Sequence, residues 1–64
     1  MIEITTINAK TITPLVGKKV KMYMKNSFMP MTVMIFELSK RTKEINIESD
    51  WIHYSKIARI EIDD

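Results

Sequence analysis

Apolar and polar residues alternate with a period of two over much of the chain, most clearly from residue 20 onward. In segment 20–25 the apolar set is Val20, Met22 and Met24, and the intervening set is Lys21, Tyr23 and Lys25. Successive side chains of a β-strand point to opposite faces of its sheet, so this pattern predicts a half-buried strand.

The same alternation returns at intervals along the chain, over residues 31–36, 44–48, 51–54 and 58–62. Both sides of segment 31–36 are partly apolar, which is typical of a central strand or of a strand at a subunit contact. Turn-forming stretches separate the segments, namely Asn26-Ser27, the polar and basic reversal at 38–42, and Ser49-Asp50. Four or five short strands at a spacing of roughly 8–12 residues predict a small barrel or sandwich.

The first nineteen residues have a weaker pattern. Their isoleucine and threonine side chains are β-branched and favour extended structure, while a short helix over residues 6–10 stays open. Pro14 fixes its own φ, so it begins a turn or one helical turn. Gly17 is expected at positive φ shortly before the strand that begins at Val20.

A chain of 64 residues accommodates one domain. We expect an all-β fold over residues 1–64, in which an N-terminal segment, 1–15, holds a short helix or an extra strand and residues 16–62 form a small barrel of about five antiparallel strands. With 45% hydrophobic and 28% charged residues the chain can fold. A core of this size rarely supplies more than ~3–5 kcal/mol, so oligomerisation or a partner is expected to add stability.

Several classes of site are excluded by composition. The chain has no cysteine, which removes disulfides and thiolate zinc sites, and its single histidine leaves little for a metal centre, so no metal or cofactor is expected. One glycine cannot build a phosphate-binding glycine loop. No apolar run reaches the ~18–20 residues of a membrane span, and the first residues do not resemble a signal peptide. We therefore expect a cytoplasmic protein with no membrane partner.

Two stretches of the chain resemble the Sm-like family. Residues 15–26 are similar to the opening of its domain, a leucine-glycine-lysine lead-in followed by an alternating strand and an Asn turn, and residues 51–62 are similar to its last two strands. The resemblance implies an SH3/Sm-like barrel and an RNA-binding homo-oligomer. The chain departs from the family at residues 30–33, which lack the usual glycine, and at 39–42, which lack the usual Asp…Asn pair.

Basic residues fall in two groups and suggest a nucleic-acid site, and aromatic residues cluster separately at 51–54. One basic group lies on or before the first clear strand (Lys18, Lys19, Lys21 and Lys25), and the other lies at the reversal after Leu38 (Lys40, Arg41 and Lys43). Cations neutralise phosphates and aromatic faces stack unpaired bases. The candidate RNA-binding residues are Lys40, Arg41, Lys43, Tyr54 and Lys56. The alternative for the cations is a solvated, charged strand edge. The alternative for the aromatics is that Trp51 closes one end of the core and Tyr54 packs with its hydroxyl in water.

Methionine and phenylalanine are concentrated between residues 22 and 36. The expected inward set is Val20, Met22, Met24, Met31, Val33 and Ile35. Four further apolar residues are then surplus, and they form a candidate interface with another protein or a second copy: Phe28, Met29, Met34 and Phe36. Methionine adapts readily to partners, although it also fills irregular cores, and that alternative remains open.

We find no catalytic constellation, because Ser27, Ser39 and Ser55 have no accompanying histidine and acid in a recognisable motif. A barrel this small also lacks room for an enclosed substrate pocket, so neither an enzyme nor a small-molecule substrate is expected. The main hypothesis is an Sm-like RNA-binding protein that acts as a homo-oligomer. The alternative is a small regulator or inhibitor, of the kind found in mobile genetic elements, that docks on a larger host protein. A structural subunit of a larger assembly is a third option.

Overall fold

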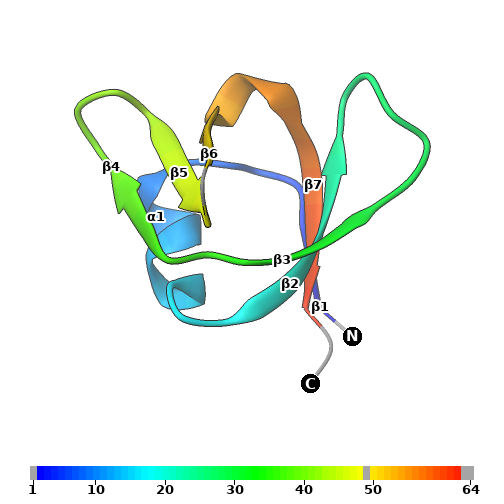
Figure 1. Cartoon of the computed structure of the whole chain (residues 1–64), viewed down its shortest axis with the longest axis horizontal. Helices are drawn as coiled ribbons and strands as arrows, with labels where there is room; N and C mark the ends of the chain where they lie inside the picture. Colours follow the sequence, from blue (N-terminus) through cyan, green and yellow to red (C-terminus); the bar gives the residue numbers. More distant parts are fainter. Residues whose placement is uncertain (1, 49, 63–64) are drawn as a thin grey trace.

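The computed structural model describes residues 2–48 and 50–62 and contains strands throughout (Figure 1). The elements follow one another as β1 (Ile2–Ile4), α1 (Ala9–Ile12), the 3₁₀ turn η1 (Thr13–Leu15), β2 (Lys19–Met24), β3 (Met31–Met34), β4 (Glu37–Ser39), β5 (Glu44–Ile47), β6 (Asp50–His53), the 3₁₀ turn η2 (Tyr54–Lys56) and β7 (Ile57–Ile62). Ser49, from the predicted Ser49-Asp50 turn, lies outside the described residues.

The strands form two antiparallel sheets. One has the order β1-β7-β2-β3 and the other the order β4-β5-β6. Figure 1 shows the smaller sheet opposite the larger one, with α1 beside β4. The all-β class is confirmed. The expected closed barrel is corrected, because no pairing among the described strands joins the two sheets into a ring, and the described residues form seven strands rather than about five.

The chain passes from one sheet to the other at Ile35 and Phe36. The Ile35 N–H donates to the Lys18 carbonyl beside β2, over 3.2 Å, whereas the Phe36 N–H donates to the Asn46 carbonyl of β5, over 2.9 Å. Segment 31–36 was predicted to be a single strand, and the structure shows that it is not. The strand β3 ends at Met34, and a new strand, β4, begins at Glu37 and continues to Ser39, within the segment 38–42 that was expected to be a polar reversal.

The N-terminal segment contains both an extra strand and a helix. The strand β1 pairs with β7. The helix α1 begins at Ala9, three residues after the start of the helix that was left open over residues 6–10. Asn8 caps the helix, since its side chain accepts from the Thr11 N–H while the Thr11 hydroxyl accepts from the Asn8 N–H, both over 3.0 Å. Pro14 lies in the first turn of η1, and Gly17 has a φ of 86°, as the sequence predicted.

The core lies between the two sheets and the α1–η1 segment. Its buried apolar residues are Ile12, Leu15, Val20, Met22, Ile35, Ile45, Tyr54, Ile57, Ile60 and Ile62. Met31, expected in this set, is instead 37% exposed, because it lies at the end of an edge strand. Trp51 does not close the core, since its side chain lies on the outer face of the small sheet and is 46% exposed.

Candidate functional site

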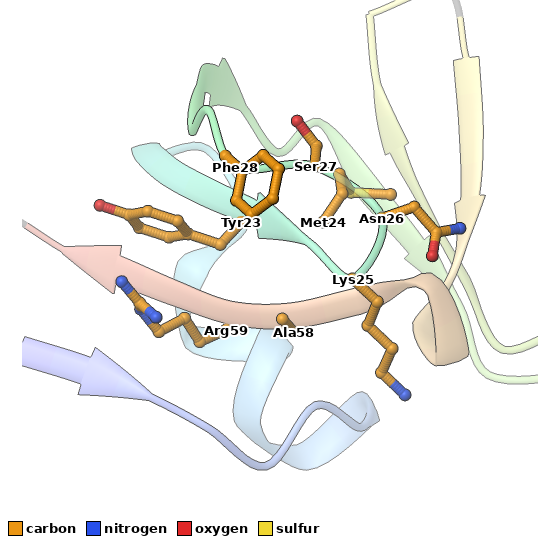
Figure 2. Close-up of a pocket in the computed structure, with 8 residues that line it drawn as sticks. All are labelled: Tyr23, Met24, Lys25, Asn26, Ser27, Phe28, Ala58 and Arg59. Atoms are coloured by element: carbon orange, nitrogen blue, oxygen red, sulfur yellow. The ribbon is translucent and has the colours of Figure 1, made fainter.

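An open groove lies where the end of β2, the β2–β3 turn and β7 meet. Its volume is about 550 Å³, and it is lined by Tyr23, Met24, Lys25, Asn26, Ser27, Phe28, Ala58 and Arg59 (Figure 2). In Figure 2 the Tyr23 ring and the Lys25 side chain lie toward opposite ends of this groove. One end therefore holds the Tyr23 ring with Arg59 beside it, and the other holds Lys25.

Local backbone contacts shape the groove. The register between β2 and β7 shifts between Tyr23 and Met24, and this bulge turns the end of β2. Beyond it, the Lys25 N–H donates to the Lys56 carbonyl, over 3.0 Å, and the Ser27 N–H donates to the Met24 carbonyl, over 3.2 Å. These bonds hold the turn against η2 and β7, so the lining residues have a defined arrangement.

The aromatic end contains a cluster around Tyr23. The Arg59 guanidinium carbon lies 3.9 Å from the centroid of the Tyr23 ring, and the Tyr23 hydroxyl donates to Glu61 Oε1, over 2.9 Å. Arg59 Nε lies 3.4 Å from Glu3 Oε2 and 4.0 Å from Glu61 Oε2. The carboxylates offset the charge of Arg59, and Arg59 covers one face of the ring. Tyr23 is thus held in place by its hydrogen bond to Glu61 and by Arg59 over one face of its ring.

Phe28 and Met29 are the most exposed large apolar residues among residues 2–48 and 50–62. The Phe28 side chain is fully exposed and that of Met29 is 74% exposed. Of the other predicted interface residues, Phe36 is exposed and Met34 is half-buried on β3. The four residues therefore extend from the β2–β3 turn along β3 to the start of β4, and Phe28 among them lines the groove.

The predicted RNA-binding residues do not form one surface with Tyr54. Lys40, Arg41 and Lys43 lie in the exposed turn between β4 and β5, and Lys40 borders a separate hollow of about 530 Å³ beside α1. Lys43 contacts the start of η2 only through its carbonyl, which accepts from the Tyr54 N–H over 2.9 Å. Lys56 is exposed and lies next to the groove, through its backbone bond to Lys25.

Tyr54 cannot stack a base, because its side chain is only 8% exposed and belongs to the core. The alternative with a hydroxyl in water is wrong as well, since the Tyr54 hydroxyl is buried and has no hydrogen-bond partner. Its burial raises the pKa of the hydroxyl above its usual value, because the charged form would lose its hydration.

The unpartnered hydroxyl makes Tyr54→Phe a stabilising change. We expect the free energy of unfolding to rise by about 1 kcal/mol at neutral pH, because an unsatisfied buried hydroxyl is removed. A raised pKa in the folded state means that stability is complete below the unfolded pKa of about 10 and is lost as pH rises through the folded value. The advantage of the variant over the wild type should therefore widen above that pH. Urea unfolding across pH measures both effects.

Tyr23→Phe is the matched control, since it removes a hydroxyl that does donate a hydrogen bond, to Glu61. It should lower stability at neutral pH or leave it unchanged. If Tyr54→Phe were destabilising by a similar amount, the Tyr54 hydroxyl would have a partner in solution.

The groove was missed in the sequence, although part of its signal was visible. The alternation of β2 places Tyr23 outward, and Arg59 lies outward on β7, but nothing in the sequence pairs two residues 36 positions apart. His53 serves a local purpose, because its Nδ1 accepts from the Ser55 N–H over 3.1 Å and caps η2.

Residues 2–48 and 50–62 contain no cluster of three or more histidine, cysteine or carboxylate side chains arranged to hold a metal ion. Within the same residues, no helix has the length and apolar character needed to cross a membrane. Comparisons with protein-family models, with curated proteins and with solved structures found no match.

Proposed function

We propose that the protein is a non-enzymatic module that binds single-stranded RNA in the groove beside the β2–β3 turn and that it acts as a homo-oligomer. The observation that carries this proposal is the polarity of the groove, with an aromatic platform at one end and a lysine at the other. A nucleotide has the same polarity, since it joins a flat base to an anionic phosphate.

Base stacking is supported by the two aromatic side chains. Arg59 covers only one face of the half-buried Tyr23 ring, and the Phe28 side chain is fully exposed. Each base stacked on an aromatic side chain contributes ~1–3 kcal/mol in known single-strand binders. The groove volume of about 550 Å³ falls within the ~300–1,000 Å³ of small-ligand sites, which suits one or two nucleotides.

Phosphate binding is supported by the cations at the other end. Lys25 lines the groove, Lys56 follows from η2, and none of the eight lining residues is acidic. The lining also includes no histidine, aspartate or glutamate, the side chains that most often act as a general acid or base. The resemblance of residues 15–26 and 51–62 to the Sm-like family favours the same ligand.

Binding of a fluorescent single-stranded oligoribonucleotide, followed by anisotropy over a series of salt concentrations, tests the proposal. Affinity should fall as salt rises, because phosphate contacts release condensed cations. Lys25→Ala should weaken binding and reduce the slope of log affinity against log salt by about 1.

Lys40→Ala is the matched control, because Lys40 is exposed but borders the other hollow. It should bind as the wild type does. An equal loss in both variants would return the site to the β4–β5 turn, and affinity that does not change with salt would rule out a phosphate-dependent site.

A protein partner is the second candidate, and the exposure of Phe28 and Met29 favours it. Large exposed apolar side chains commonly mark protein contacts. Native mass measurement of the protein purified from cells distinguishes the two candidates. A mass that drops after nuclease treatment indicates RNA, whereas a nuclease-resistant complex that contains a second protein indicates a regulator.

A further inference from the structure

The two sheets expose four edge strands, and only one of these strands carries no charge. The edges are β1 and β3 in the larger sheet and β4 and β6 in the smaller one. Glu3, Glu37 and Asp50 lie on three of them, whereas β3 reads Met-Thr-Val-Met. Charged residues on an edge prevent other strands from pairing with it. Three of the four edges are therefore protected, and β3 is not.

The surroundings of β3 extend this unprotected edge. Residues 26–36 contain no charged side chain at all. Pro30 precedes the strand and cannot block pairing along residues 31–34. Thr32 is exposed, Met31 is partly exposed and Phe36 is 47% exposed. Such a strand, β-forming and uncharged, is prone to pair with another chain unless something covers it.

We propose that β3 pairs with β3 of a second copy, antiparallel about a two-fold axis, and joins the two larger sheets into one continuous sheet. This inference rests on the proposed homo-oligomer and names its interface. A two-fold contact brings the same strand of both copies together, so a charged residue on that strand lies near its own copy and opposes the pairing. Glu3, Glu37 and Asp50 place such a charge on β1, β4 and β6, whereas β3 carries none.

Self-pairing would also add stability that so small a domain has difficulty supplying alone. A chain of about this length buries only about 60% of its unfolded surface, so its folded state gains from a second copy. Pairing at β3 would cover Met31 and add backbone hydrogen bonds on the free side of the strand. The groove would stay open, because its wall is formed by the β2–β3 turn, β2 and β7.

Thr32→Glu tests the interface, with Thr42→Glu as the matched control. In one copy Thr32 lies opposite Lys21 on β2, so a glutamate there gains a favourable partner and the monomer stays folded. In the dimer the same change adds a carboxylate to the paired strand of each copy, and these like charges oppose the pairing. Thr42 is exposed in the β4–β5 turn and takes the same substitution away from β3.

Sedimentation equilibrium of nuclease-treated, RNA-free protein over a dilution series gives the result. The wild type and Thr42→Glu should reversibly form dimers, and Thr32→Glu should raise the dimer dissociation constant by about tenfold or more. Circular dichroism should show that Thr32→Glu remains folded. A wild type that is monomeric at every concentration, or a Thr32→Glu that dimerises as the wild type does, would overturn the interface.

RNA binding by the same variants separates this inference from the proposed function. A monomeric wild type that still binds RNA would overturn the β3 interface and the homo-oligomer, and would leave RNA binding in the groove standing. A dimer that dissociates on Thr32→Glu would support the interface even where no RNA binds, and would leave the groove as the part that failed.

Discussion

Ile60→Ala is expected to leave the protein largely unfolded at room temperature. Ile60 is fully buried at the centre of β7, opposite Met22 on one side and Ile4 on the other. Truncating a buried isoleucine to alanine costs ~2–5 kcal/mol, because transfer energy is lost and a cavity remains. A core of this size supplies only ~3–5 kcal/mol in total, so one such loss removes most of the stability. Urea unfolding followed by circular dichroism measures the change.

Ile2→Ala is the appropriate comparison for that variant. Ile2 pairs with the same strand, β7, but its side chain is half exposed. The same chemical change should cost much less there and leave a folded protein. If Ile60→Ala unfolded at nearly the wild-type urea concentration, the core would be able to close around the missing atoms, and the sheet would not depend on that packing.

The strands could be predicted wherever one face of a segment meets the core and the other meets water. Segments 20–25, 44–48 and 58–62 alternate cleanly, and each contains a strand. Gly17 could be predicted as well, because a positive φ follows from the residue type and its place before a strand. These features are local, since each depends on a few neighbouring residues.

The division of the strands between two sheets could not be predicted in this way. The change of sheet at Ile35 and Phe36 depends on backbone hydrogen bonds to Lys18 and Asn46, which are distant in sequence. A period of two continues through that point, so the pattern has no signal for it. The alternation indicates which residues share a face, but it does not identify the partner strand.

The aromatic segment 51–54, which begins within β6, shows a related limit of the sequence pattern. The alternation correctly places Trp51 and His53 on one face and Ile52 and Tyr54 on the other, but it does not say which face is buried. Tyr54 enters the core as η2 begins there. The predicted stacking of a base on Tyr54 does not fit a ring that is buried in this way.

The groove depends on contacts that the sequence does not reveal. The bulge beside Met24 and the bond from Lys25 to Lys56 bring the turn against β7, and Arg59 then lies over Tyr23. Lys25 belongs to the basic residues that the sequence emphasises, but its neighbours in space come from other strands. The site is therefore a product of tertiary packing, and its residues share no motif.

Phe28→Ala is expected to weaken binding of single-stranded RNA by about tenfold or more, since the loss of one stacked base removes ~1–3 kcal/mol and 1.4 kcal/mol corresponds to a factor of ten. The fully exposed Phe28 side chain contributes little to the core, so the variant should unfold at the same urea concentration as the wild type. The dependence of affinity on salt should also stay the same, because no phosphate contact is lost. Anisotropy titrations over several salt concentrations measure both quantities.

Two further variants identify what Phe28 does. Phe28→Trp keeps an aromatic face in the groove and should retain RNA affinity. If it does, the loss in Phe28→Ala comes from the missing aromatic ring and not from a change in the backbone of the turn. Phe36→Ala removes another exposed phenylalanine that does not line the groove, and it should bind RNA as the wild type does. If Phe28→Ala bound RNA normally but no longer associated with a protein that co-purifies with the wild type, the β2–β3 turn would be a protein-docking surface, and the regulator hypothesis would replace RNA binding.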